Sequence, residues 1–442
     1  MASPPITEHR PSEAQEDADR MSRSSLMMAW WAVLSAIFYL VVAAAMARSY
    51  GTANALIGIV MSILVYSAIN AVLSRFAQRT GLTVAEFSRT LFGRLGALVA
   101  TLIFFATALY YAVFEGYVMA LALSHQSGWP MALTTLVVVI VGIALIGAGV
   151  QRFLDRFNAW LLPVYLLGML AAVWLAIDGY GYPEGWLTRV PEGGAPAFGW
   201  WHTFTYYMGI WVLMMFTFDY ARFGKDRDRR FHARITFGLP FYALAFGFSA
   251  VVGILLDATL PTAGLSEAAI VMGLLELMGL AGLVLVWVTQ SRINTANYFL
   301  ATSNLASLLG QWRAGKACYG LAMALVAALA WALMSADVFG YLLTALAYQG
   351  IFVVAWVGVA LSHILSRAAR DTAPASVEED EPVYRLAGLG AWAGACLAGV
   401  VLMHQPTLAS FSAPATFLLA FTLSRLLPGG SIDVAGLSPS RD

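Results

Sequence analysis

Charged residues are scarce in this chain. Only 11% of its 442 residues are Asp, Glu, Lys or Arg, whereas 60% are hydrophobic. A typical soluble domain carries about 25% charged residues. The scarcity excludes an ordinary soluble globular protein and indicates an integral membrane protein. The formal net charge is zero and the charges are confined to a few short stretches, so the overall charge does not indicate a partner. For a membrane protein of this kind we expect no nucleic-acid partner.

Cysteines and catalytic motifs are also rare. The two cysteines, Cys318 and Cys396, lie far apart in or beside apolar segments, which fits small buried side chains better than a disulfide or a metal site. No nucleophile motif and no His/Asp metal cluster is present, and the histidines at 125, 202, 363 and 404 fall at the ends of apolar runs. We therefore expect no metal, no cofactor and no enzymatic activity. A receptor is disfavoured because no soluble signalling domain is present.

The amino-terminal segment, residues 1–25, is polar and contains Arg10, Arg20 and Arg23. It precedes a full-length apolar run that is not followed by a small-residue cleavage site, which argues against a cleaved signal peptide. We predict a disordered cytoplasmic tail.

Long apolar runs fill most of the chain. A membrane-spanning helix needs about 20 mostly apolar residues, and runs of this kind predict an all-α polytopic membrane protein with twelve transmembrane helices. They cover residues 26–47, 52–73, 96–123, 130–148, 157–177, 200–220, 237–256, 277–305, 318–334, 337–364, 386–403 and 407–427.

Basic residues alternate between successive loops. Lys and Arg are retained near cytoplasmic helix ends, and here they follow the second, fourth, sixth, eighth and tenth runs. The intervening loops carry mainly acidic residues, with Arg189 as an exception. This pattern predicts a multi-pass protein of a bacterial inner membrane with cytoplasmic termini. We expect a monomer whose partners are the lipid bilayer and a small-molecule substrate.

The longest hydrophilic connection, residues 366–385, separates ten runs from a final pair. The predicted parts are a transport core at 26–365 with repeats at about 26–177 and 200–364, a cytoplasmic linker at 366–385, two accessory helices at 386–427 and a cytoplasmic tail at 428–442. Because each repeat has an odd number of helices, the second would enter the membrane inverted relative to the first.

The eighth run contains an unusual number of amide side chains. In the stretch TQSRINTANYFLATSNL, residues 289–305, four of them fall within an arc of about 80° on a helical wheel. These are Gln290, Asn294, Asn297 and Asn304. Amides both donate and accept hydrogen bonds, which suits a neutral polar ligand. Hydrogen bonding between helices is the alternative, and the pattern leaves both open.

Arg292 lies on the same run, about 140° around the helix from Asn297. It is too deep for its guanidinium to reach water easily, and its burial costs about 2.5–3.5 kcal/mol on insertion scales. It therefore needs acceptors. One interpretation is a functional cation, and the other is a structural arginine held by backbone carbonyls or a carboxylate.

The third run contains ALYYAVFEGYVMA, in which Tyr111 and Glu115 are one turn apart and share a face. Glu115 lies well inside its run, which makes it a functional candidate. The pair suits a flat ring that stacks on the tyrosine while the carboxylate binds its edge. A structural pairing with Arg292 is the alternative.

The sixth run ends in FTFDYARFGK. Asp219 and Arg222 are three residues apart, so we predict a gating or structural role in which they pair with each other or with a neighbouring element. Trp211 lies deeper, beside Gly209, where a helix can bend. It is a candidate substrate contact, although tryptophans in membrane helices more often face lipid or the core.

Three stretches together resemble the purine/cytosine permease family, the nucleobase:cation symporters that include cytosine permease and the allantoin and hydantoin transporters. They are RTGLTVAEFSRTLFGRLGA (79–97) after the second run, FTFDYARFGK (216–225) in the sixth and INTANYFLATSNL (293–305) in the eighth. All three occur in the family's order, and the resemblance covers roughly residues 26–365.

The resemblance implies a LeuT-like five-plus-five inverted repeat with broken first and sixth helices and alternating access around a midplane site. By motif, the two side chains that flank the flat substrate fall on Tyr111 and Glu115. The substrate asparagine falls on Asn297, with Asn294 nearby. A helix-six tryptophan falls near Trp211, although its spacing to the motif aspartate is off by one. We add Gln290 from the amide stripe to the predicted substrate-binding set.

Three features depart from the family's pattern. Relatives bind sodium between helices one and eight, and Arg292 falls on one of the hydroxyl positions that hold the ion. A guanidinium would occupy the ion's place, so we predict transport that is facilitated, exchanging or proton-linked through Glu115 rather than sodium-dependent. Glu115 replaces a side chain that is usually neutral, which favours a donor-rich or cationic ligand. The first run has no glycine between Leu26 and Ala47, which argues against a break there.

Together these patterns predict a secondary transporter for a small nitrogen heterocycle, a nucleobase or a related compound. An amino-acid or amine carrier on the same scaffold is the alternative.

Overall fold

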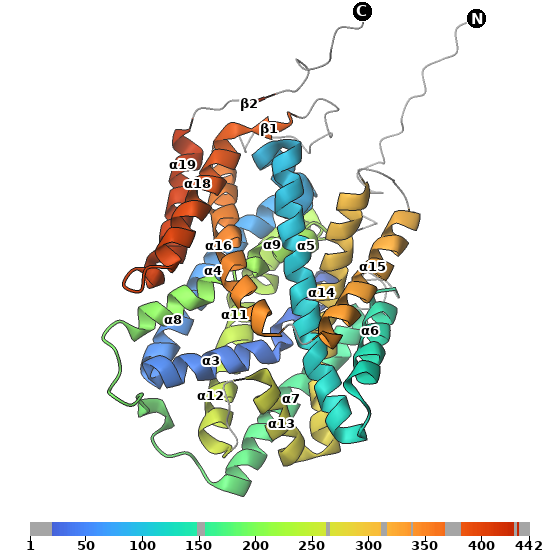
Figure 1. Ribbon diagram of the computed structural model, residues 1–442, viewed down its shortest axis with the longest axis vertical. Coiled ribbons are helices and arrows are strands. Elements are labelled where there is room, and N and C mark those ends of the chain that lie inside the picture. The colour runs from blue at the N-terminus through green and yellow to red at the C-terminus, as the bar shows by residue number, and fades with distance from the viewer. Residues whose placement is uncertain are drawn as a thin grey trace, which may run out of the picture.

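The computed structural model consists almost entirely of helices (Figure 1). It describes residues 20–147, 155–261, 266–310, 316–336, 339–366, 382–427 and 431–432. By length and apolarity, seven of the described helices can cross a membrane, or eight if a bent pair at the start of the chain forms one span. The predicted class, an all-α membrane protein, is confirmed.

The elements follow the predicted runs closely. The first half contains α2 (Arg23–Trp30), η1 (Trp31–Ser35), α3 (Ile37–Tyr50), α4 (Thr52–Thr80), α5 (Val84–Ser127), α6 (Met131–Gly147), α7 (Asp155–Tyr180) and η3 (Trp186–Thr188). The next part contains α8 (Gly199–Met208), α9 (Val212–Ala221), η4 (Asp226–Asp228), α10 (Arg229–Phe231), η5 (His232–Thr236), α11 (Leu239–Tyr242), η6 (Ala243–Phe248), α12 (Ser249–Thr259), α13 (Glu267–Met278) and α14 (Leu280–Gly310). The last part contains α15 (Lys316–Ser335), α16 (Phe339–Ile364), β1 (Tyr384–Arg385), α18 (Leu386–Met403), η7 (Ala409–Phe411), α19 (Ser412–Leu426) and β2 (Ser431–Ile432). Helices prevail because backbone groups in lipid must find their partners within the chain.

The first span is broken, as the resemblance implied, although it contains no glycine. η1 ends at Ser35, Ala36 is extended with φ −62° and ψ 127°, and α3 starts at Ile37. The axes on either side differ by 46°. No glycine is needed because φ stays negative, in a region open to any residue. The break depends instead on partners from other helices.

The sixth span is broken between α8 and α9. The amides of Gly209, Ile210 and Trp211 each bond to the carbonyl three residues earlier, at 3.0–3.1 Å, which tightens the turn. A Cβ added at Gly350 of α16 would lie 3.2 Å from the Cα of Gly209, so α16 passes close to this break.

The third and eighth spans, α5 and α14, are the longest helices and lie side by side in the core (Figure 1). With broken first and sixth spans, this arrangement fits the five-plus-five fold. α5 has a kink of its own at Gly93, where φ is 76°. There the amides of Arg94 and Leu95 donate to the carbonyls of Pro382 and Val383, both at 3.2 Å.

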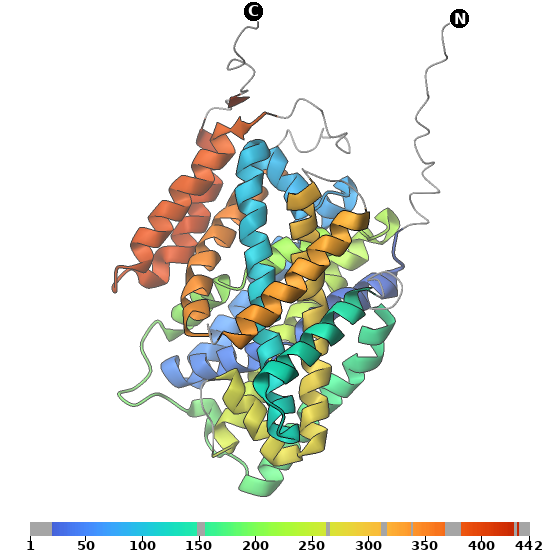
Figure 2. The same ribbon diagram turned by 45° about the vertical axis from the view of Figure 1, so that its right-hand side comes forward.

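The accessory helices α18 and α19 form a pair packed on α16 at one side of the core, drawn in red in Figure 2. The two short strands beside them are antiparallel, with Arg385 opposite Ser431. Most of the predicted linker and carboxyl-terminal tail lies outside the described residues, as do residues 1–19.

Two features extend beyond the sequence expectation. Helix α13 separates the seventh and eighth spans and was not predicted, because residues 257–276 were assigned to the loop between those two runs. The first helix begins at Arg23 rather than Leu26, and Met21 already forms a β-bridge with Gly224. The last residues of the predicted tail are therefore ordered against the sixth span.

Candidate functional site

A closed cavity lies where the two helix breaks meet α5 and α14. Its polar lining is Tyr111 and Glu115 from α5 and Asn297 from α14. The aromatic side chains of Phe38, Tyr39 and Phe216 and the aliphatic groups of Ala36, Ile210, Val212, Leu213 and Ile293 complete the lining. Its volume of about 20 Å³ has room for one water molecule. This conformation is therefore closed around the site.

Glu115 is 1% exposed, and Gln290 is its hydrogen-bond donor. The same glutamine accepts from the amide of Ile37, the first residue of α3, at 3.4 Å. Gln290 thereby links the buried carboxylate to the broken part of the first span. It does not line the cavity itself.

The other amides of the predicted stripe have different roles. Asn294 donates to the carbonyl of Ala112 on α5 at 3.2 Å, and Asn304 donates to Leu300 in its own helix at 2.8 Å. Asn297 donates to the side-chain oxygen of Asn294 at 3.4 Å and also lines the cavity. One amide of the stripe therefore faces the cavity, while the others join or brace helices.

Arg292 is fully buried at the break of the first span. Its guanidinium donates to the carbonyl of Trp31 at 2.7 Å, to the carbonyl of Asn158 on α7 at 2.5 Å and to Ser35 Oγ at 3.3 Å. Ser35 Oγ donates in turn to the carbonyl of Thr289 on α14, at 2.9 Å. Arg292 thus joins the first, fifth and eighth spans through backbone carbonyls rather than by pairing with Glu115.

Trp211 is 1% exposed but does not line the cavity. Its ring contacts Tyr66 and Phe417 edge-on, with centroids 6.3 Å and 5.3 Å away. The preceding residue, Ile210, faces the cavity instead, which matches the one-residue discrepancy in the motif spacing.

Asp219 and Arg222 are not paired through their side chains in the contacts of the described residues. The Asp219 carboxylate accepts from the amide of Val84 at 3.1 Å, at the amino end of α5. Arg222 Nε donates to the backbone carbonyl of Asp219 at 3.3 Å, and its guanidinium stacks over Phe223 at 4.4 Å. Of the two predicted alternatives, Asp219 uses the neighbouring element.

A wider pocket of about 530 Å³ adjoins the cavity on the side where α3 ends and α8 begins. Phe38, Tyr111 and Ile210 line both spaces and separate them. Phe38 meets Tyr111 edge-on at 6.2 Å. Near its mouth, Tyr50 and His202 stack at 5.2 Å. We call this pocket the vestibule.

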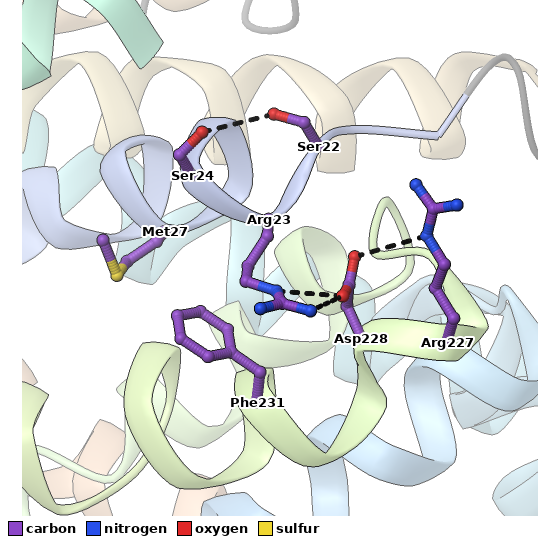
Figure 3. A pocket seen from close by; sticks show the side chains of 7 residues that line it. All are labelled: Ser22, Arg23, Ser24, Met27, Arg227, Asp228 and Phe231. Carbon is purple, nitrogen blue, oxygen red and sulfur yellow. Dashed lines mark hydrogen bonds and ion pairs between the residues drawn. The ribbon is translucent and has the colours of Figure 1, made fainter.

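The opposite side is closed by contacts of the first helix. Figure 3 shows Arg23 of α2 reaching Asp228, at 2.5 Å, with Phe231 beneath the guanidinium at 4.9 Å. Arg20 donates to the carbonyls of Gln78 and Gly224 at 3.3 and 3.2 Å, and Ser25 Oγ donates to Asp155 at 2.5 Å. These contacts tie the start of the first span to the ends of the second and sixth and to the start of the fifth. We call this side the terminal face.

Sequence reasoning missed the residues that the first-span break supplies, namely Ser35, Ala36, Phe38 and Tyr39. The resemblance implied a break in the first span but not its position, and the serine at residue 35 was the only polar side chain near it. Among the described residues, no group of three or more His, Cys, Asp or Glu side chains could hold a metal ion.

Comparison with known proteins shows the fold. No protein-family model matches the sequence, and no curated protein matches it. Among solved structures, the chain is similar to Mhp1, a nucleobase-cation-symport-1 family transporter, in a closed conformation with bromovinylhydantoin bound. The TM-score is 0.74 at 17% identity, covering 92% of each chain.

Two other structures are similar. One is Mhp1 in an inward-facing conformation, with a TM-score of 0.67 at 16% identity, covering 92% of this chain and 91% of that one. The other is a Na⁺-coupled sialic acid symporter in a substrate-bound outward-open state, with a TM-score of 0.61 at 12% identity, covering 95% and 93%. The chain therefore has the fold of these multi-pass membrane transporters.

Proposed function

We propose that this protein is a secondary transporter that moves a small nitrogen heterocycle across the membrane by alternating access. The observation that carries the proposal is the shared cavity of Tyr111, Glu115 and Asn297 between two broken spans. In folds of this type, substrate sites lie near the bilayer midplane, where helices are discontinuous.

The chemistry of the lining supports a flat, donor-bearing ligand. The tyrosine ring offers a stacking surface, worth about 0.5–1.5 kcal/mol beyond area burial. Glu115 offers acceptors, and Asn297 offers both donor and acceptor groups. The cavity must widen to admit a ring, and the vestibule supplies the path, with Phe38, Tyr111 and Ile210 at its floor. The similar structure that holds bromovinylhydantoin supports the same ligand class.

Arg292 supports a transport cycle without sodium. It brings a fixed positive charge to the carbonyl of Trp31, at the start of η1, and to the side chain of Ser35, the last residue of η1. We propose that it takes the place of the cation and that coupling is to protons through Glu115 or absent. Cytoplasmic termini, a bacterial inner membrane and a monomeric state complete the proposal.

Uptake into proteoliposomes tests both the proposed substrate class and the proposed independence from sodium. We expect radiolabelled nucleobases or hydantoins to enter at equal rates with sodium or choline outside, and Asn297→Ala to abolish entry. Strict sodium dependence would contradict the role of Arg292 while leaving transport itself intact. A complete lack of uptake and of ligand-induced thermal stabilisation across nucleobases, hydantoins and pyrimidine precursors would contradict the substrate class.

An amino-acid or amine transporter is the second candidate. The observation that favours it is the position of Ile210, which puts an aliphatic side chain into the cavity at the break of the sixth span, where the resemblance placed a tryptophan. Stabilisation by amines or amino acids, but not by heterocycles, would select this alternative.

A further inference from the structure

A third pocket lies on the terminal face, away from the central cavity. It has a volume of about 580 Å³ and is enclosed by α5, the end of α16, the start of α18 and the end of α19. It therefore sits at the seam between the core and the accessory pair, where the spans leave the membrane.

The lining of this pocket is basic and rich in hydroxyl groups. Arg385, Arg425 and His363 line it together with the hydroxyls of Thr90, Ser362 and Ser424. No carboxylate is among its lining residues, and neither arginine forms an ion pair with any carboxylate in the part of the chain that the structure describes. Guanidinium and hydroxyl groups arranged in this way are donors for a phosphate group.

Backbone geometry fixes the position of one arginine. Arg385 is held in β1 opposite Ser431 and is the residue before α18, whose amino end has no side-chain cap. A Cβ at Gly388 would lie 2.0 Å from the carbonyl of Leu91, so only glycine lets α18 start this close to α5. The amino end of a helix also favours an anion.

The surroundings of the pocket are apolar. Leu365, Leu386 and Leu426, each next to a lining residue in sequence, are 52%, 46% and 77% exposed. A basic centre with an apolar margin at the end of membrane spans matches a phospholipid, whose headgroup is charged and whose chains are apolar.

A second pocket on the terminal face, lined by Arg23, Arg227, Asp228 and their neighbours, differs in the partners of its arginines (Figure 3). There, Arg23 and Arg227 lie within 4.0 Å of the Asp228 carboxylate. Both arginines there thus have a carboxylate partner, whereas Arg385 and Arg425 have none among the described residues.

We propose that the pocket formed by His363, Arg385 and Arg425 binds the phosphate headgroup of an anionic phospholipid. The bound lipid joins the accessory helices to the core by bridging α16, α18 and α19. This site is independent of the substrate cavity.

Binding can be measured by native mass spectrometry and thermal unfolding of the full-length protein, with phosphatidylglycerol, phosphatidylcholine or inorganic phosphate added. We expect phosphatidylglycerol to be retained and to raise the unfolding midpoint, with little effect of phosphatidylcholine. The double variant R385Q/R425Q should bind phosphatidylglycerol about thirtyfold more weakly, because each basic side chain near the surface contributes about fivefold.

The matched control is R230Q/R234Q, which removes two exposed arginines from the loop after the sixth span and should bind as the wild type does. R385K/R425K keeps the charge and should retain part of the affinity, which separates loss of binding from loss of folding. Equal retention of both lipids, or unchanged affinity in R385Q/R425Q, would overturn the proposal. A preference for inorganic phosphate over lipid would also overturn it. The same holds if lipid binds only after the acidic residues are changed to amides, because the pocket would then be occupied by the chain's own acidic run; these residues are Glu378, Glu379, Asp380 and Glu381.

Discussion

The guanidinium of Arg292 lies 2.7 Å from the carbonyl oxygen of Trp31, the first residue of η1. The arginine comes from the eighth span, and its other bonds reach Ser35, the last residue before the break, and the carbonyl of Asn158 in the fifth span. One buried cation therefore joins the eighth and fifth spans to the helical segment that precedes the break at Ala36.

Replacing Arg292 with threonine should create a response to sodium. The change removes the guanidinium donor from the carbonyls of Trp31 and Asn158, and a hydrogen bond to a charged group contributes about 1.5–3 kcal/mol. Sodium should then recover stability, by about 2.7 kcal/mol at a hundredfold excess over its dissociation constant. Thermal unfolding in sodium chloride and in choline chloride measures the difference. Arg292→Lys, which keeps the charge, should show no response, and a wild type stabilised by sodium as strongly as the variant would refute the idea.

Replacing Glu115 with glutamine should weaken binding of a donor-rich or cationic ligand by roughly tenfold to a hundredfold, because hydrogen bonds to charged groups contribute about 1.5–3 kcal/mol. If Glu115 carries the coupled proton, uptake driven by a proton gradient should stop while exchange at equal pH continues. Isothermal titration and counterflow in proteoliposomes measure these quantities. Glu115→Asp keeps the charge, so its ligand affinity should fall between those of the wild type and of Glu115→Gln. Wild-type affinity in Glu115→Gln would show that the carboxylate does not bind the ligand.

Tyr111 and Trp211 should respond differently to substitution, although both were predicted to contact substrate. Tyr111 lines the cavity, so Tyr111→Ala should reduce ligand affinity by about threefold to tenfold, the equivalent of one stacking interaction. Trp211 packs between Tyr66 and Phe417, so Trp211→Phe should leave affinity nearly unchanged. Equilibrium binding of the same radiolabelled ligand compares them. A larger loss of affinity in Trp211→Phe than in Tyr111→Ala would show that the open site uses the tryptophan.

Gly253→Ala should destabilise the protein. A Cβ at this position would lie 2.3 Å from the carbonyl of Leu40, so α12 and α3 must separate. Overpacking of this kind costs about 1–3 kcal/mol. The control is Gly320→Ala on α15, where a Cβ meets nothing within 4 Å. Unfolding midpoints in detergent compare the pair, and equal midpoints would mean that the two helices separate at no cost.

The amino-acid sequence by itself determined the class and order of the spans. Apolar length is a local property, and bilayer thickness fixes how much of it a helix needs. The sequence also identified Tyr111, Glu115 and Asn297 as polar groups at depth, since such groups are costly in lipid unless they serve a purpose.

Only the tertiary structure decided how these groups are used. The break at Ala36, the choice of Ile210 over Trp211 as cavity lining and the bonding of Asp219 to Val84 all depend on residues from other helices. The burial of Arg292 was predictable, and backbone carbonyls were one of its two predicted kinds of acceptor. Which carbonyls it bonds was not predictable, because every residue possesses one. A pattern of side chains identifies which groups need partners, and the packing of helices decides which partners they find.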